Sequence, residues 1–229
     1  MRIREHGIHY HVIARCNGGS RLIIGDEECC SLLKYIVYYI GVHKCCLFQY
    51  VIMPSHLHMM LMTEGHGTVD QLMHDICLCY SHDYNRRHGR TGHFWRHHYR
   101  NKIIDNDCYA LACMRYLDRN PVAAGLVKTP DEWRWSGYHY YANGIPCDFL
   151  TPHPSYGLLG NDDFGRRLIY KSMVGDEIIA PKDERILFES YARTSSKRYR
   201  NIVQRVTKDI YSHLHAESRI YNRKPLPIV

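Results

Sequence analysis

The chain has 229 residues, of which 45% are hydrophobic, and this is enough for one compact domain with a core and an appendage. No stretch approaches the ~20 consecutive apolar residues that a membrane helix needs. The first residues also lack the apolar segment of a signal peptide. We therefore expect a cytoplasmic protein that has no membrane partner.

The ten cysteines do not follow the spacing of a disulfide scaffold or of a zinc site. Some are adjacent, as Cys29 and Cys30 are, and no CxxC motif occurs. In a cytoplasmic chain of this size a cysteine usually acts as a small buried hydrophobe. We expect reduced thiols.

The net charge of +7 is unevenly distributed along the chain. Residues 86–102 and 193–208 contain several lysines and arginines and no acidic residue. The first of these stretches also contains Phe94, Trp95 and Tyr99. Cations interleaved with aromatic rings suit a polyanion whose bases can stack, such as a nucleic acid. A solvated surface is the alternative interpretation of such a charge run.

Hydrophobic periodicity and turn residues predict most elements of the first 120 residues. In chain order these are a strand at 8–16, a helix at 26–41, strands at 47–53 and 56–62 that form a hairpin, a helix at 68–87, a strand at 94–104, and a helix from Asn106 or Asp107 to Arg119. Pro121 disfavours helical backbone at Asn120, so we expect the last helix to end there.

This order predicts an α+β fold of the ferredoxin-like or RRM-like kind, with an antiparallel sheet and helices on one face. The other face would remain open to a ligand. The prolines at 146, 152 and 154 indicate a linker, followed by helices at 164–173 and 183–214 and an unstructured tail. We therefore expect a main domain over residues 1–144 and a basic, mainly helical extension over residues 145–229.

The first candidate site is His56-Leu57-His58 on the second strand of the hairpin. Residues two apart in a strand point to the same face, so the two imidazoles lie side by side and can hold a divalent metal. The alternative is a pair of half-exposed histidines with no ligand, because a chain with 17 histidines offers such pairs by chance.

The second candidate site is Tyr116 with Asn120, which share a helix face because they are four residues apart. A tyrosine phenol is a poor nucleophile at its usual pKa of ~10. It becomes useful where a nearby group stabilises the charge of the phosphate that it attacks. The alternative is an ordinary core tyrosine, since the chain has 19 tyrosines. Residues 85–90 are interpreted as either a phosphate clamp or a basic loop.

Several segments resemble the REP-associated tyrosine transposases, which are relatives of the small single-strand insertion-sequence transposases with one catalytic tyrosine. The resemblance covers about residues 8–142 and depends on the order and spacing of its segments. These segments are Tyr10 to Arg15, Met53 to Leu61, Asn85 to His93, Tyr116 to Val127 and Trp133 to Tyr138.

The resemblance implies a role for each candidate residue. His56 and His58 occupy the place of the family's metal-binding HUH pair, in which U is a hydrophobic residue. Tyr116 occupies the place of the nucleophile, and Asn120 that of the third metal ligand. The implied activity is cleavage and rejoining of single-stranded DNA through a covalent 5′-phosphotyrosine, as in DNA transposition. We expect Mg²⁺ or Mn²⁺ as the metal ion.

The chain departs from the usual sequence of the family directly after the tyrosine, at Leu117, Asp118 and Arg119. Asp118 would point away from Tyr116 on a helix. We therefore expect it to alter a surface without loss of catalysis.

The implied substrate is single-stranded or hairpin DNA, bound by a monomer or a homodimer. Arginines are expected to contact the phosphate backbone, which positions a strand without reading its sequence. The candidates are Arg15, Arg86, Arg87, Arg90, Arg96 and Arg100.

Three other functions use similar residues. A non-catalytic binder of single-stranded nucleic acid on the same fold would keep the open sheet without needing all four site residues. A metal-dependent phosphodiesterase would use water as the nucleophile in place of Tyr116. A replication initiator or relaxase would share the HUH chemistry in a larger chain.

Overall fold

The computed structural model describes residues 7–64 and 68–175. Its helices and strands are β1 (His9–Arg15), α1 (Gly25–Val42), β2 (Cys45–Met53), β3 (His56–Thr63), α2 (Val69–Arg87), β4 (Arg100–Ile104), α3 (Asp107–Ala123), α4 (Tyr138–Asn143), α5 (Pro154–Gly157) and α6 (Asp163–Gly175). Two short 3-10 helices, η1 (Asn17–Gly19) and η2 (Pro130–Glu132), lie in the connections. None of the helices in these two ranges is long and apolar enough to cross a membrane.

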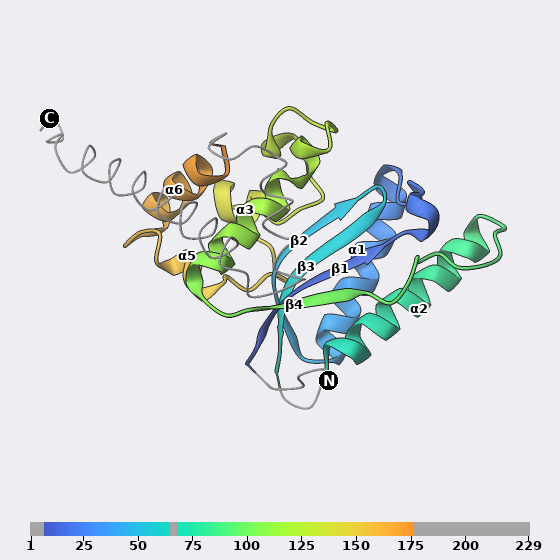
Figure 1. Cartoon of the computed structure of the whole chain (residues 1–229). Helices are drawn as coiled ribbons and strands as arrows, with labels where there is room; N and C mark the ends of the chain where they lie inside the picture. The colour runs from blue at the N-terminus through green and yellow to red at the C-terminus, as the bar shows by residue number, and fades with distance from the viewer. Residues whose placement is uncertain (1–6, 65–67, 176–229) are drawn as a thin grey trace, which may run out of the picture.

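The four strands form one sheet in the order β2-β3-β1-β4, and each pair of neighbours is antiparallel (Figure 1). With α1 after β1 and α2 after β3, this is the strand order of a ferredoxin-like fold. The predicted α+β class and the predicted hairpin are therefore confirmed. Two features of the register matter for function: Ile13 on β1 lies opposite His58, and Arg15 lies opposite His56.

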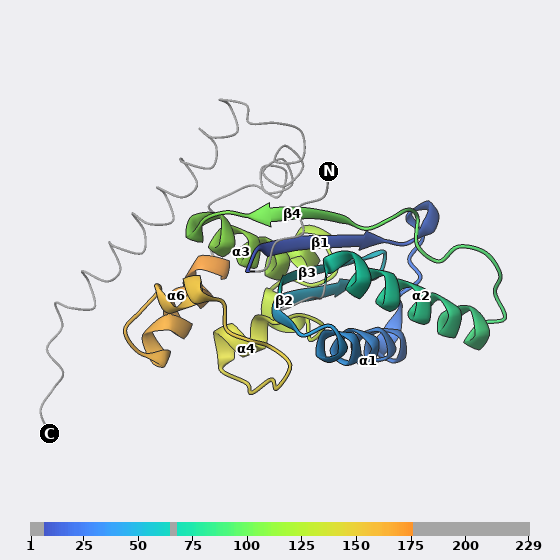
Figure 2. The same ribbon diagram turned by 90° about the horizontal axis from the view of Figure 1, so that it is seen from below.

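Helices α1 and α2 pack against each other and cover one face of the sheet (Figure 2). Side chains alternate between the two faces of a strand, and every second residue of β1 and β3 is apolar and buried on this side. A cap also fixes where α2 begins, because the Thr68 side chain accepts a hydrogen bond from the Gln71 amide in a capping box. This layer contains the larger of the two hydrophobic cores.

The opposite face is covered in part, by α3 against β2 and β3 and by α4 and α6 behind α3. The prediction of helices on one face thus holds for α1 and α2, and α3 occupies part of the face that we expected to be open. The reason is the second apolar set on α3, which includes Leu111, Met114 and Leu117 and is buried with Met60 of β3. Among the described elements, the contacts of α3 with the sheet are mainly with β2 and β3, so the less covered part lies at β1 and β4.

Two predicted boundaries are wrong for local reasons. The strand β4 begins at Arg100 instead of residue 94, because Phe94 is buried and Trp95 makes only an isolated bridge with Cys16. Helix α3 continues past Asn120 to Ala123 with Pro121 inside it. Pro121 lacks the N–H that would donate to the carbonyl four residues back, but the helix resumes after it, because the Ala124 amide donates to the Asn120 carbonyl at 3.0 Å.

Residues 145–153, predicted as a linker, pack closely against the sheet. The Thr151 amide donates a hydrogen bond to the Leu47 carbonyl at 2.9 Å, and Leu150 is buried in the first core. The predicted helix at 164–173 is confirmed as α6, which buries Tyr170, Met173 and Val174 in the second core. The predicted helix at 183–214 and the tail lie outside the described residues.

Candidate active site at the junction of the sheet and helix α3

The strand β3 carries the two histidines of the HUH pair. Leu57, between them, is buried in the core formed with α1 and α2. His56 and His58 therefore face the opposite side of the sheet, and their ring centroids are 4.8 Å apart. The side chain of His58 is fully buried, whereas that of His56 is partly exposed. The predicted side-by-side pair is present.

Helix α3 brings Tyr116 and Asn120 to this pair. The side chain of Asn106 caps the helix by accepting a hydrogen bond from the Tyr109 amide at 2.9 Å. The Tyr116 ring then lies edge-on to the ring of His58, with centroids 5.5 Å apart. The amide nitrogen of Asn120 lies 3.4 Å from Nε2 of His58. The four residues singled out in the sequence thus converge on one point.

A fifth residue, His11, extends the cluster behind His58. The Asn120 amide nitrogen can only donate, so Nε2 of His58 accepts and the proton of a neutral His58 lies on Nδ1. Nδ1 of His58 is 2.9 Å from Nε2 of His11, which accepts that proton. This arrangement fixes the His58 tautomer and leaves the lone pair of Nε2 directed at Asn120.

The surroundings keep these imidazoles neutral. Burial, together with the positive charge of Arg15, lowers the pKa of His56 to about 4, although a hydrogen bond with Asn120 acts in the other direction. Burial, followed by the charges of His56, His11 and Arg15, lowers the pKa of His58 well below its ordinary value. Burial and the charge of Lys102 lower the pKa of His11 to about 3. Neutral imidazole is the form that binds metal ions.

The donor set fits a divalent cation that prefers mixed nitrogen and oxygen ligands. His56 and His58 supply imidazole nitrogens, and Asn120 supplies an amide oxygen. Across residues 7–64 and 68–175, no group of three or more histidine, cysteine, aspartate or glutamate side chains is arranged to hold a metal ion. The candidate set differs from such groups because its third member is an amide.

Three of the six predicted DNA-contacting arginines lie near these residues. Arg15 is exposed beside His56 on the neighbouring strand. Arg100 is exposed on β4 opposite Ile13 of β1, two strands from His58 on β3. The amide of Arg96, which is also exposed, donates a hydrogen bond to the carbonyl of Arg15 at 2.8 Å. The result is a positively charged border along the open part of the sheet.

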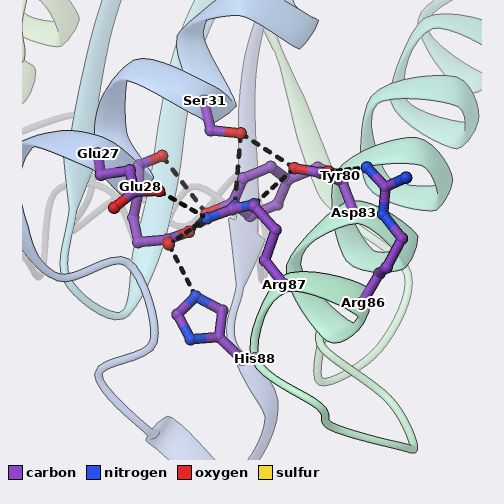
Figure 3. A network of polar contacts seen from close by, with 8 residues as sticks. All are labelled: Glu27, Glu28, Ser31, Tyr80, Asp83, Arg86, Arg87 and His88. Carbon is purple, nitrogen blue, oxygen red and sulfur yellow. Dashed lines mark hydrogen bonds and ion pairs between the residues drawn. The ribbon is translucent and has the colours of Figure 1, made fainter.

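The other three arginines belong to α2 and the loop after it. Arg87 joins the two helices, because its guanidinium donates to Glu28 of α1 at 2.5 and 2.9 Å and to Asp83 of α2 at 2.9 Å (Figure 3). Arg86 points to solvent, with 82% of its side chain exposed, and pairs with Asp83. The guanidinium of Arg90 lies over the Tyr84 ring. Helix α2 covers the opposite face of the sheet, so the structure does not bring Arg86 and Arg87 to the candidate site.

The expectation that Asp118 alters a surface is wrong. Its side chain is 1% exposed and accepts hydrogen bonds from Gln49 at 3.2 Å and from the Tyr170 hydroxyl at 2.5 Å. Burial raises the pKa of Asp118 to about 8. It does point away from Tyr116, but α6 covers the side of α3 to which it points.

His11 and Lys102 are neighbours of the site that the sequence pattern does not predict. His11 lies on β1, which is next to β3, and Lys102 lies opposite His11 on the edge strand β4. The available signal was the pattern His9-Tyr10-His11, which has the same two-residue spacing as His56-Leu57-His58. Its meaning depends on strand order, because only the pairing of β1 with β3 brings the two patterns together.

A family comparison covers the same residues. The sequence model described as "Transposase IS200 like" matches residues 4–120, which is more than half of the chain and includes all four predicted site residues. The chain belongs to the IS200-like transposase family. This confirms the resemblance seen in the sequence, and it gives the chain a role in DNA transposition as a DNA-processing enzyme.

One solved structure of a similar protein agrees on the fold. A REP-associated tyrosine transposase bound to a REP hairpin superposes with a TM-score of 0.54 and 19% sequence identity, covering 67% of this chain and 90% of that chain. A provisionally named transposase from Deinococcus radiodurans gives a TM-score of 0.39 at 14% identity, covering 48% of this chain and 88% of its own. No curated protein matches the chain with significance.

Proposed function

We propose that this transposase family member cuts and rejoins single-stranded DNA, with a hairpin beside the cut, through a covalent bond to Tyr116. The observation that carries the proposal is the convergence of Tyr116 and Asn120 on His56 and His58. These residues come from one helix and one strand that are far apart in the sequence. A binding protein does not require a phenol, an amide and two neutral imidazoles at one point.

In this proposal His56, His58 and Asn120 hold a divalent ion, Mg²⁺ or Mn²⁺. When bound, such an ion supplies positive charge to a phosphate and makes its phosphorus more electrophilic. The three side chains are poised for this role because burial keeps both imidazoles neutral and the His58 lone pair is directed at Asn120. His11 holds His58 in that orientation from behind.

The chemical step is an in-line transesterification by Tyr116. Its phenol loses a proton to water, and the oxygen attacks the phosphorus of a DNA phosphodiester. The bond from the phenol oxygen to phosphorus forms while the bond from phosphorus to the 3′ oxygen breaks, and that oxygen takes up a proton. The new phosphotyrosine keeps the energy of the phosphodiester, so a second 3′-hydroxyl reverses the step and joins a new strand without ATP.

The positively charged border of Arg15, Arg96 and Arg100 is proposed to hold the backbone of the strand at this site. Contacts of this kind position a phosphate without reading sequence. The similar solved transposase is bound to a REP hairpin, which supports a hairpin as the substrate here. Arg86, Arg87 and Arg90 remain proposed contacts, but the ion pairs of Arg87 favour an internal role for it.

The active site is proposed to be complete within one chain. His58 and Tyr116 of the same chain have ring centroids 5.5 Å apart, so no second copy is needed to supply the tyrosine. A monomer is therefore sufficient for one cleavage step.

The test compares wild-type protein with Tyr116→Phe on a labelled single-stranded hairpin oligonucleotide, with Mn²⁺ or with EDTA. We expect a covalent protein–DNA adduct on a denaturing gel with Mn²⁺, and none with EDTA or with Tyr116→Phe. Tyr109→Phe is the matched control, because Tyr109 is on the same helix two turns earlier. Cleavage that persists without Tyr116 would identify a phosphodiesterase that uses water. Binding with neither cleavage nor adduct would identify a non-catalytic binder.

A further inference from the structure

The end of α6 lies against the helix that carries the nucleophile. Nε of Arg115 donates a hydrogen bond to the Met173 carbonyl at 2.7 Å, and Arg119 donates to the Val174 carbonyl at 2.9 Å. Both arginines are buried, with 3% and 7% of their surface exposed. A backbone carbonyl has two lone pairs, so it accepts a side-chain hydrogen bond whether or not it is bonded within its helix. Two guanidinium groups of α3 therefore hold two backbone carbonyls of α6.

A second contact joins the middle of α6 to α3. The Tyr170 hydroxyl donates to the buried carboxyl of Asp118 at 2.5 Å. Nε2 of Gln49 on β2 donates to both oxygens of that carboxyl at 3.2 Å and lies 3.3 Å from the Tyr170 hydroxyl. One polar cluster in the core thus connects α6, α3 and the sheet.

The residues that make these contacts alternate along α3 with the catalytic candidates. Arg115 precedes Tyr116, and Asp118 and Arg119 lie between Tyr116 and Asn120. Tyr116 and Asn120 share the face that looks onto the histidines, and the side chains of Asp118 and Arg119 leave the helix toward α6. The segment of α3 from Arg115 to Asn120 therefore contacts α6 on one side and the histidines of β3 on the other.

We propose that α6 is a positioning element of the catalytic unit, and that Arg115, Asp118 and Arg119 fix α3 so that Tyr116 and Asn120 keep their place over the histidines. The consequence for cleavage rests on the proposed function, whereas the anchoring itself does not.

This anchoring matters because transesterification depends on the placement of the attacking atom. A shift of about 1 Å in such an atom costs on the order of 100-fold in rate. Most of the packing of α3 on β2 and β3 is apolar, through residues such as Leu111, Met114 and Leu117. Apolar contacts are non-directional, whereas hydrogen bonds require a defined distance and angle. The polar contacts to α6 give the helix a defined position.

The experiment uses the full chain and the variant Tyr170→Phe, which removes one hydroxyl from α6 and leaves its ring. The matched control is Tyr156→Phe, because the Tyr156 hydroxyl donates at 2.9 Å to the Tyr141 carbonyl on α4. The first readout is hydrogen exchange of the α3 amides, with those of α1 as the internal reference. The second is the single-turnover rate of adduct formation at saturating protein, with the dissociation constant for the oligonucleotide measured separately.

We expect Tyr170→Phe to speed exchange in α3 by about fivefold, as the loss of one net hydrogen bond implies, with α1 unchanged. We expect its cleavage rate to fall by about tenfold or more while DNA affinity changes little. Tyr156→Phe should do neither. Equal effects of the two variants on both readouts, or an α3 that exchanges as in the wild type, would overturn the proposal.

Arg119→Lys and Arg119→Met provide an independent check at the end of α6. Lysine keeps a cation at the Val174 carbonyl and should retain most of the rate, and methionine should lose it. If lysine and methionine behave alike, Arg119 does not position α3. If the wild type forms no adduct but Tyr170→Phe still loosens α3, the anchoring stands and the proposed transesterification fails.

Discussion

His11 has a distinct role among the residues of the site because it touches a proposed ligand and not the substrate. It accepts the Nδ1 proton of His58, and this keeps Nε2 of His58 free to bind a metal ion. Partners of this kind orient a ligating imidazole and raise its basicity.

Replacing His11 should therefore weaken metal binding without removing a ligand. We expect His11→Leu to lower Mn²⁺ affinity by about 10- to 100-fold, the usual effect of losing such a partner. His11→Gln offers an oxygen acceptor at the same place and should retain most of the affinity. The measurement is a titration of free Mn²⁺ by electron paramagnetic resonance. Wild-type affinity in His11→Leu would show that the contact does not support the site.

Two adjacent arginines at the end of α2 carry the same charge in different environments. The side chain of Arg87 is 24% exposed and pairs with Glu28, which is 7% exposed, whereas that of Arg86 is 82% exposed. An exposed ion pair contributes roughly 0–1 kcal/mol to folding, and removal of one partner from a buried pair costs roughly 3–5 kcal/mol.

We expect Arg87→Ala to lower the free energy of unfolding by about 3 kcal/mol, the lower end of that range because Arg87 is partly exposed. Arg86→Ala is the matched control and should lose less than about 1 kcal/mol. Urea unfolding measures both. If both variants are equally stable and Arg87→Ala binds DNA more weakly, Arg87 is a DNA contact, as predicted from the sequence.

At the scale of elements, the contact between α1 and α2 is sensitive to acid through Glu28. Burial acts to raise the pKa of Glu28, but hydrogen bonds from Arg87, His88 and Tyr80 outweigh it and hold the pKa below its ordinary value. The unfolded chain then takes up the proton at higher pH than the folded protein does. The stabilisation is present above the unfolded pKa of about 4.3 and is lost as the pH falls through the lower folded pKa.

The free energy of unfolding should therefore fall less steeply in Glu28→Gln than in the wild type between about pH 5 and about pH 3. The glutamine does not titrate, so its variant lacks this contribution at every pH. Glu27→Gln, on the same turn but with a side chain that is 87% exposed, should keep the wild-type slope. Parallel slopes for Glu28→Gln and the wild type would mean that Glu28 does not stabilise the helix pair.

The elements that the sequence predicts well are those whose apolar pattern is local. The hairpin of β2 and β3 follows from two apolar runs around Pro54-Ser55, and α2 follows from its cap and its 3.6-residue period. The start of β4 was misplaced because residues 94–99 contain aromatic side chains that suit a strand but pack as a loop. The burial of Asp118 could not be predicted, because it depends on a helix more than 40 residues further along the chain.

In the candidate site too, the local features can be predicted from the sequence, whereas those that depend on the packing of distant segments cannot. The spacing of His56 with His58, and of Tyr116 with Asn120, predicts which side chains share a face. That the two pairs face each other depends on how α3 crosses the sheet, and only the resemblance to a family predicts this crossing. His11 was missed because its contact arises from the pairing of β1 with β3.

Residues 145–175 belong either to the main domain or to an appendage of it. The sequence places the boundary after residue 144, at the first of three prolines. In the described part of the chain, residues 145–175 contribute side chains to both cores. The buried ones include Leu150, Leu159, Tyr170, Met173 and Val174. We propose that the domain includes residues 145–175.

Two truncated chains distinguish these boundaries. Each large buried apolar side chain contributes roughly 1.5–3 kcal/mol, so losing the five named above removes an amount close to the whole stability of a domain, roughly 5–15 kcal/mol. A chain of residues 1–175 should therefore unfold in one cooperative transition, and a chain of residues 1–144 should not. Thermal unfolding followed by circular dichroism measures both. If residues 1–144 unfold cooperatively at nearly the same temperature, α6 is an appendage that the core does not require, and the boundary lies after residue 144 as the prolines indicate.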